Sequence, residues 1–436
     1  MKLTGWGLFP SADCCVTQPR DMTQIRKALE QGPLIARGNG RSYGDSAMNS
    51  NHTLDMRRLN RLLSFDPTSG QLIAEAGTTL AEIIDIFLPR GFFPLITPGT
   101  RFVTLGGMVA ADVHGKNHHK VGPMRNCIDW LDVMLSDGNI IRCSSTENAD
   151  LFDWTCGGMG LTGIILRVAF RLQRVESGWL RQRNFIAANL NEALDLFEQH
   201  QEASYSVAWI DCLASGDKLG RSILMLGEHA AAKDIPLSAQ IFPRAGRATT
   251  IPFTAPAFAL NSWSMRAFNE IFYQLKSRQT DEVLVRWDDY FYPLDKLLQW
   301  NRLYGRKGFL QFQCVLPLAQ AGEGLSAILK ATASAQQGSF LAVLKRLGEE
   351  GGGLSFPMAG YTLALDFPVS DKSLRLLDRL DEIVISHGGR FYLAKDARME
   401  SDSLTRSDPR SLILKELRRK NEFLRFHSLQ SERLKL

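Results

Sequence analysis

The chain has 436 residues, of which 44% are hydrophobic and 22% are charged, and its formal net charge is +5. This length predicts two or three domains, and the composition excludes disordered, collagen-like and disulfide-scaffold proteins. Eight lysines and arginines against three glutamates lie between Arg410 and Leu436, so the basic excess is concentrated in this tail. The balanced remainder makes binding to nucleic acid unexpected, whereas the tail is either a solvated helix face or a surface attracted to a membrane.

Seven cysteines show no CxxC spacing and are odd in number, which argues against a metal site and a disulfide framework. A reducing compartment is therefore expected. The first residues contain no apolar run of signal-peptide length, and no uncharged apolar stretch is long enough to span a bilayer. We expect a cytoplasmic protein that does not cross the membrane but could touch its inner face peripherally.

The N-terminal part, residues 1–176, alternates short apolar strands with glycine turns. A strand is predicted over Leu72–Ala76, after a turn rich in proline and glycine. Thr79 and Glu82 form a capping-box pattern, which starts a helix ending near Pro89. A further helix is predicted to start at Thr146 and to run toward Cys156.

Longer strands alternate with amphipathic helices over residues 177–388, which predicts an antiparallel sheet with helices on one face. The fold class expected for the whole chain is therefore α+β, with two domains. A C-terminal segment, residues 389–436, follows with a strand over Arg390–Lys395 and a helix capped by Asp408 with Pro409 at its first position. The predicted strands of the middle part are Ser204–Asp211, Phe309–Leu316 and Tyr361–Pro368, and its helices lie near Asn191–His200, Leu325–Ala335 and Lys372–Ser386.

The stretch Thr249–Phe268 is apolar, contains two prolines and has no clear period. It is too irregular for a buried helix and too apolar for an ordinary loop. It therefore covers a substrate cleft, touches a lipid surface or packs as a loop on its own domain.

Glycine-rich turns are numerous in the N-terminal third, and several of them converging could wrap a dinucleotide with backbone N–H groups. The Rossmann pattern is only imperfectly matched over Gly38–Gly44, and no acidic residue follows at the distance that a nicotinamide site requires. No P-loop is present. The turns are Arg37–Asp45, Pro98–Thr100, Gly106–Gly107, His114–Gly115 and Gly157–Gly163.

A second dense feature is the loop His114-Gly115-Lys116-Asn117-His118-His119, which offers a titratable base, an amide and positive charge. It suits an anionic cofactor or substrate better than zinc, because the cysteine or carboxylate partners of a zinc site are missing. The third feature, Tyr392-Leu393-Ala394-Lys395-Asp396, alternates like a strand and carries a lysine.

These motifs, together with LGGMVAADVHGKNHH, CGGMGLTGII, FLQFQCVLP and GGRFYLAKDAR, resemble the FAD-linked oxidases of the vanillyl-alcohol-oxidase type over nearly the whole chain. Within that superfamily the resemblance is to the branch that oxidises decaprenylphosphoryl ribose, in the cell-envelope route to arabinose. It implies an FAD-binding domain built from residues 1–176 and 389–436, with residues 177–388 covering the substrate. The implied FAD-binding residues are Arg37, Gly38, Asn39, Gly40, Arg41, Ser42, Tyr43, Gly44, Pro98, Gly99, Thr100, Thr104, Gly106, Gly107, Ala111, His114, Gly115, Asn117, Gly158, Gly160, Gly163, Ile164 and Tyr392.

The resemblance also implies oxidation of the 2-hydroxyl of a polyprenylphosphoryl ribose, with a separate NAD-dependent reductase completing an epimerisation. Lys395 is expected to orient that hydroxyl and to assist its deprotonation, with Lys116 and His114 as electrostatic partners. The first glycine loop holds no histidine, so the FAD is expected to be non-covalent. The expected substrate-binding residues are Trp209, Phe291, Arg302, Gln311, Gln313, Lys345, Thr362 and Ala364.

Three residues depart from the family pattern. Phe291 stands where the family has a tyrosine, which removes a hydroxyl from the sugar side. Thr362 and Ala364 replace an asparagine and a reactive cysteine. These departures leave open an oxidase of the same fold that acts on a soluble sugar or aldonolactone, for which Thr249–Phe268 and the basic tail would be ordinary surface. Under the lipid-linked alternative both segments would lie near the membrane, while a non-catalytic flavin carrier is disfavoured by the lysine-bearing loops.

Overall fold

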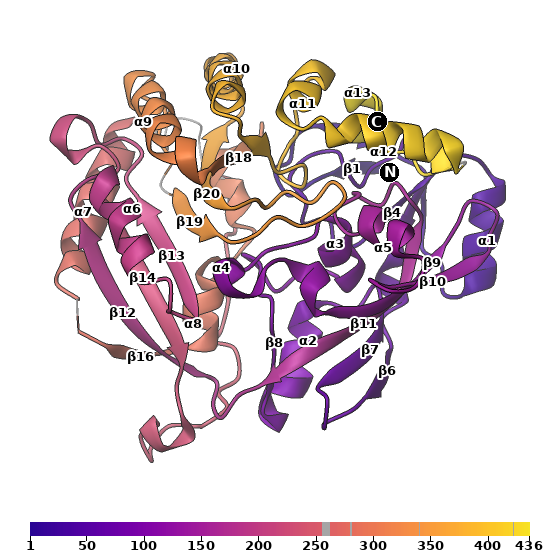
Figure 1. Cartoon of the computed structure of the whole chain (residues 1–436), viewed down its shortest axis with the longest axis horizontal. Coiled ribbons are helices and arrows are strands. Elements are labelled where there is room, and N and C mark those ends of the chain that lie inside the picture. The colour runs from indigo at the N-terminus through magenta and orange to yellow at the C-terminus, as the bar shows by residue number, and fades with distance from the viewer. Residues whose placement is uncertain (255–261, 280, 340, 422) are drawn as a thin grey trace.

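The computed structural model describes residues 1–254, 262–279, 281–339, 341–421 and 423–436. Two sheets organise it, and the C-terminal helices cross back over the first part of the chain (Figure 1). In the view of Figure 1 the N-terminal unit lies on the right and the large second sheet on the left, with both termini near the upper right. The chain passes from one sheet to the other between Arg174 and Trp179.

The N-terminal unit contains a six-stranded antiparallel sheet in the order β10-β9-β11-β7-β6, with β8 paired to β11. A small parallel sheet, β3-β5-β4, carries the first glycine loop at the end of β4. The strands are β1 (Lys2–Thr4), β2 (Ser11–Asp13), β3 (Val16–Thr17), β4 (Ile35–Arg37), β5 (Thr53–Asp55), β6 (Leu62–Phe65), β7 (Gln71–Glu75), β8 (Phe92–Pro94), β9 (Ile128–Met134), β10 (Ile140–Cys143) and β11 (Ile164–Arg174). The helices are α1 (Met22–Glu30), α2 (Leu80–Phe87), α3 (Leu105–Ala110), α4 (His118–Val121) and α5 (Ala149–Thr155).

The capping-box prediction is confirmed: the Thr79 hydroxyl accepts from the Glu82 N–H, and the Glu82 carboxylate accepts from the Thr79 N–H at 2.7 Å. The predicted start at Thr146 is wrong by three residues. The Ser144 hydroxyl accepts from the N–H groups of Thr146 and Glu147, so these residues form a turn that holds them out of helix α5.

The second unit is an eight-stranded antiparallel sheet in the order β16-β12-β14-β13-β19-β20-β18-β21. Its strands are β12 (Trp179–Ala187), β13 (Tyr205–Ile210), β14 (Ser222–His229), β16 (Val283–Arg286), β18 (Phe309–Pro317), β19 (Val343–Leu347), β20 (Gly360–Pro368) and β21 (Arg390–Phe391). The short strands β15 (Thr249–Thr250) and β17 (Leu297–Leu298) pair in parallel outside it. The helices are α6 (Leu190–Gln199), α7 (Ser262–Ser277), α8 (Trp287–Phe291), α9 (Leu318–Ser334) and α10 (Asp371–Ser386), followed by α11 (Ser401–Ser407), α12 (Arg410–Lys420) and α13 (Leu429–Leu434).

Helices α6, α9 and α10 cover one face of this sheet, as the alternation of its strands predicts. Alternate side chains of β18 and β20, including Phe312, Leu316, Leu363 and Phe367, form the core beneath them. The expected α+β fold with helices on one face is confirmed. Among the described residues, every helix is too short or too polar to traverse a bilayer.

Three predicted elements differ in extent. The expected strand Arg390–Lys395 ends at Phe391, because only Arg390 and Phe391 pair with β18. Helix α9 begins at Leu318, seven residues before the predicted start, and helix α12 begins at Arg410, after Asp408 and Pro409. The stretch Thr249–Phe268 was expected to be irregular; residues 255–261 lie outside the described residues, but its last part is the first half of helix α7.

Candidate active site

The candidate active site lies on the face of the large sheet opposite to α6, α9 and α10. Strand register places alternate residues of four neighbouring strands side by side on this face. Gln311 pairs with Asp366 and Gln313 with Ala364 across β18 and β20, while Lys345 of β19 pairs with Thr362. Side chains alternate between the two faces of a strand, so the predicted substrate residues on these strands share one face. This face carries several polar side chains, whereas the opposite face is apolar. The residues on this face are Trp209, Gln311, Gln313, Val343, Lys345, Thr362, Ala364 and Asp366.

Three lysines from distant parts of the chain converge above this face. Lys345 belongs to β19, Lys116 to the loop between α3 and α4, and Lys395 to a turn after β21. Burial lowers the pKa of Lys116 to about 7 and the pKa of Lys345 to about 8, and the positive charge of Lys345 lowers the first of these further. Three buried amines near one another make a site that favours an anion, because a negative charge offsets the cost of burying their positive charge.

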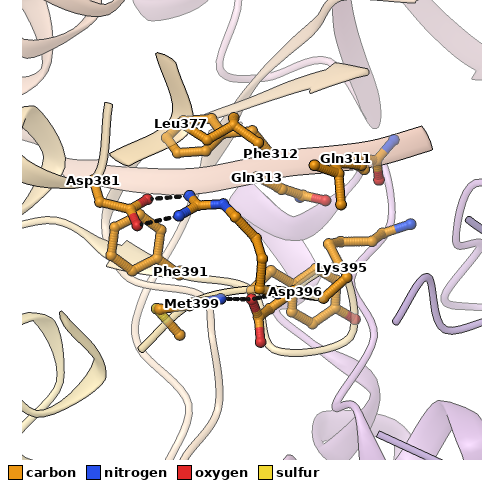
Figure 2. Close-up of a pocket in the computed structure, with 13 residues that line it drawn as sticks. Gln311, Phe312, Gln313, Leu377, Asp381, Phe391, Lys395, Asp396 and Met399 are labelled. Atoms are coloured by element: carbon orange, nitrogen blue, oxygen red, sulfur yellow. Dashed lines mark hydrogen bonds and ion pairs between the residues drawn. The ribbon is translucent and has the colours of Figure 1, made fainter. Parts of the chain in front are cut away.

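Lys395 sits on a turn closed by its N–H donating to the Tyr392 carbonyl at 2.9 Å. Its amine lies 3.9 Å from the centre of the ring of Tyr43, a residue of the first glycine loop. Burial lowers the pKa of Lys395 to about 7; the charge of Asp366 opposes this shift and that of Lys345 adds to it. A lysine with a pKa near neutrality exists partly as the free amine, which can accept a proton. Figure 2 shows Lys395 with Gln311 and Gln313 along one side of a small cavity next to β18.

His114 and Lys116 bring the second motif to the same place. The Nε2 atom of His114 lies 3.3 Å from the side-chain nitrogen of Gln313, and Lys116 donates to the backbone carbonyl of Tyr290. Burial, followed by the charge of Lys345, holds the pKa of His114 well below its usual value. His114 is therefore a neutral imidazole near pH 7, able to accept at one nitrogen and donate at the other.

The first glycine loop fits the pyrophosphate of FAD, judged by its hydrogen bonds. Among the described residues, the backbone N–H groups of Gly38, Asn39, Gly40, Arg41 and Ser42 find no acceptor. Side chains fix the loop around them: Arg37 donates to the Thr4 carbonyl at 2.7 Å and Asn39 to the Phe102 carbonyl at 2.8 Å. A run of consecutive free N–H groups held in place is the donor set that a phosphate takes.

The other glycine turns lie against the same loop. A side chain on Gly38 would bring its Cβ within 2.0 Å of the Thr104 hydroxyl, so this position requires glycine for the close approach to α3. A Cβ on Gly99 would meet no atom within 4 Å, which leaves open space beside the Pro98–Thr100 turn. The Oγ1 atom of Thr97 and the Oδ1 atom of Asn117 are buried there without partners among the described residues. These unsatisfied polar atoms fit a large polar cofactor such as FAD.

The remaining predicted FAD residues have identifiable local roles. Gly157 and Met159 donate to the carbonyls of Val109 and Ala110, which fastens the turn containing Gly158 and Gly160 to α3. The Ile164 side chain lies in the hydrophobic core of the N-terminal unit, so only its backbone could meet a ligand. The Tyr392 ring stacks on Phe356 at 4.7 Å, and its hydroxyl donates to the Ala111 carbonyl at 3.2 Å. Thr100, Gly115 and Gly163 lie outside regular helices and strands, as expected for turns. The predicted turn at Gly106 and Gly107 is wrong: both residues belong to helix α3, which begins at Leu105 after the Thr104 cap.

Three predicted substrate residues lie around the edge of the site. The Trp209 ring packs against Phe272 of α7 with the ring centres 4.9 Å apart, and its indole N–H has no partner among the described residues. Phe291 is 2% exposed and packs among aromatic side chains, 5.9 Å from the Lys116 amine. Arg302 donates to the Ile251 carbonyl at 3.1 Å, which places it beside the segment that leads into residues 255–261 rather than on the sheet face.

Sequence reasoning missed two groups of residues. Asp366 is 1% exposed, and its position two residues from Ala364 in an alternating strand was the available signal. Arg433 joins Asp45 and Asp396, both at 2.8 Å, and no pattern in the sequence indicates a contact between residues so far apart. Asp45 ends the first glycine loop, and Asp396 directly follows Lys395.

Comparison with known proteins agrees with this geometry. The family model described as an FAD binding domain matches residues 14–144. The chain is 33% identical over 423 residues to the decaprenylphosphoryl-β-D-ribose oxidase of Mycolicibacterium smegmatis, covering 94% of this chain and 92% of that protein. It is 28% identical over 192 residues to L-gulonolactone oxidase of Mus musculus, covering 43% of each chain. It is also 27% identical over 184 residues to cytokinin dehydrogenase 3 of Arabidopsis thaliana, covering 40% of this chain and 35% of the relative.

Proposed function

The chain belongs to the family of FAD-linked oxidases that includes decaprenylphosphoryl-β-D-ribose oxidase, and from this premise we propose that it oxidises the 2-hydroxyl of a polyprenylphosphoryl ribose to the 2-keto sugar. It is an FAD-dependent oxidoreductase acting on CH–OH groups. The product would be the intermediate of an epimerisation to polyprenylphosphoryl arabinose. A separate protein of the NAD-dependent reductase class would then return hydride to the keto carbon.

The observation that carries this proposal is the charge of the site. Lys116, Lys345 and Lys395 converge there, and Asp366 is the acid whose charge acts on Lys395. An excess of partly buried positive charge is costly unless an anion balances it. The phosphodiester of a lipid-linked sugar supplies such an anion, whereas a neutral sugar or lactone does not.

The proposed chemistry assigns a task to each residue. FAD, when bound, supplies a hydride acceptor for the sugar carbon. Lys395 holds its amine partly unprotonated near neutral pH and accepts the proton of the hydroxyl. Gln311 and Gln313 hydrogen-bond the sugar, while Lys116 and His114 stabilise negative charge near them. The FAD is proposed to be non-covalent, because no histidine occurs in the first glycine loop.

An anaerobic titration of the purified holoprotein tests the proposal. A short isoprenylphosphoryl ribose should bleach the visible flavin absorption and yield a product two hydrogen atoms lighter. Free ribose and aldonolactones, offered at the same concentration, should bleach it far more slowly. Bleaching by a lactone or free sugar but not by the lipid-linked phosphate would favour the soluble-sugar oxidase instead. No bleaching by any of them would remove the assigned activity.

A further inference from the structure

We propose that Asp366 is a positioning residue, which holds the Gln311 amide with its oxygen toward Lys395 and the substrate. This inference rests on the proposed function for the identity of the substrate, but its geometry does not. Asp366 and Gln311 are directly paired across β20 and β18. Oδ1 of the buried Asp366 carboxylate accepts from Nε2 of Gln311 at 2.6 Å.

The second hydrogen bond of Gln311 removes the ambiguity of its amide. The same Nε2 atom donates to the Tyr43 hydroxyl oxygen at 3.3 Å. Burial raises the pKa of Asp366 to about 7. Above that pH its carboxylate can only accept, so the NH2 group must face Asp366, and both of its hydrogens are used. The amide oxygen is then free for a donor, and in Figure 2 it lies on the side of Gln311 toward Lys395. A sugar hydroxyl is a donor of this kind.

Asp366 has a second effect through its charge. The titratable groups that face Lys395 are Tyr43 after β4, His114 after α3, Lys345 on β19 and Asp366 on β20 with Tyr304 beside it. Asp396, next in sequence, is bound to Arg433 instead. The Asp366 charge raises the pKa of Lys395 against burial and against Lys345. The carboxylate therefore sets both the direction of the amide and the proton affinity of the amine.

Exchanging the two functional groups separates this role from a merely structural one. In Asp366→Asn the new amide can donate or accept, so the side-chain amide of Gln311 can flip by 180°. In Gln311→Glu two carboxylates face each other and repel. In the double variant the amide and the carboxylate have changed places, so the amide on β20 donates to the carboxylate on β18, which again leaves one oxygen toward Lys395. We expect each single variant to reduce flavin by isoprenylphosphoryl ribose at least about tenfold more slowly, and the double variant to recover to within about threefold.

A second measurement does not depend on the substrate. The visible spectrum of the oxidised holoprotein, titrated with pH, should show a midpoint that is absent in Lys395→Met. This midpoint should move to lower pH in Asp366→Asn, because the negative charge that raises the pKa of Lys395 is lost. In the double variant the midpoint should return to its wild-type position. Ser339→Ala is the matched control, since Ser339 accepts from the Asp366 backbone N–H at 3.0 Å and carries no charge.

The outcomes of the two measurements are distinguishable. If isoprenylphosphoryl ribose fails to reduce the wild-type flavin, the proposed function fails, and the spectral midpoint still decides the role of Asp366. The inference is overturned if Asp366→Asn leaves the midpoint in place, or if the double variant is no better than the single variants. FAD content and melting temperature, measured for every variant, identify a variant that has lost its fold. The midpoint is then compared among the remaining variants of Asp366 and Gln311.

Discussion

At the scale of single residues, the site depends on amines placed where their charge is costly. Lys395 lies over the Tyr43 ring, and Lys116 lies 4.3 Å from the centre of the Tyr290 ring. Burial lowers the pKa of both to about 7. Because a lysine is otherwise charged up to pH values near 10, such a shift indicates a functional amine rather than a surface one.

Replacing Lys395 tests its role as proton acceptor. We expect Lys395→Met to keep its FAD but to lose at least about a hundredfold in the rate of flavin reduction, the usual contribution of a positioned base. In the wild type the rate should rise as pH increases through about 7, because the folded-state pKa of Lys395 is lowered to that value and the free amine is the reactive form. Stopped-flow absorbance measures both, with the exposed Lys330→Met as control. Near-normal reduction in Lys395→Met would exclude the assignment.

At the scale of elements, helix α7 joins the site to an apolar surface. One side of α7 carries Phe272, which packs against Trp209 at the edge of the site. The other side exposes Ile271 and Leu275, at 60% and 58%. A lipid carrier attached to a sugar in the site would emerge near such a surface, so we propose α7 as the peripheral membrane contact.

The basic tail fits that role less well than its composition indicated. Four of its eight cations hydrogen-bond or form ion pairs with other parts of the chain, including Arg418, which is fully buried and donates to the Phe426 carbonyl at 2.5 Å. The others in this group are Arg410, Arg425 and Arg433. Figure 1 places α7 and α12 at opposite ends of the molecule, so the two segments do not form one patch.

Flotation with anionic phospholipid vesicles tests α7. We expect Ile271→Glu combined with Leu275→Glu to reduce the bound fraction several-fold, because two charges replace exposed apolar contacts and are repelled by the lipid. The matched control is Leu412→Glu with Ile413→Glu on α12, whose side chains are 52% and 56% exposed. Release by the α12 pair and not by the α7 pair would reverse the assignment, and binding unchanged by both would exclude either surface.

At the scale of the whole molecule, contacts between the N-terminal and C-terminal parts of the chain hold the site together; we call them the clamp. The backbone N–H of Tyr43 donates to the Ala394 carbonyl at 2.9 Å, so the first glycine loop is bonded to the turn that carries Lys395. Arg433 of α13 then bridges the acids that follow each of these segments, Asp45 and Asp396. Both carboxylates are nearly buried, at 5% and 7% exposure.

Removing this clamp should destabilise the fold and release flavin early. We expect Arg433→Met to lower the free energy of unfolding by about 3 kcal/mol, because two buried carboxylates lose their partner. Arg419→Met, which removes a surface pair with Glu416, should cost well under about 1 kcal/mol. Urea titration followed by tryptophan and flavin fluorescence measures both, and the flavin signal should rise as non-covalent FAD dissociates. Yellow colour that stays with acid-precipitated protein would instead indicate a covalent bond.

The sequence by itself determined the class of fold and the residue types of the site. Alternation over Phe309–Leu316 and Tyr361–Pro368 specified strands with one aliphatic face, and the Thr79–Glu82 pattern specified a helix start, because these signals act over a few residues. Motif likeness supplied the FAD loops and Lys395. Tertiary structure alone decided that the strand expected to reach Lys395 ends at Phe391. It also decided that Asp366 faces Gln311 and that Arg433 joins Asp45 to Asp396. Those contacts depend on strand register and on packing between segments hundreds of residues apart, and no local pattern in the chain encodes either.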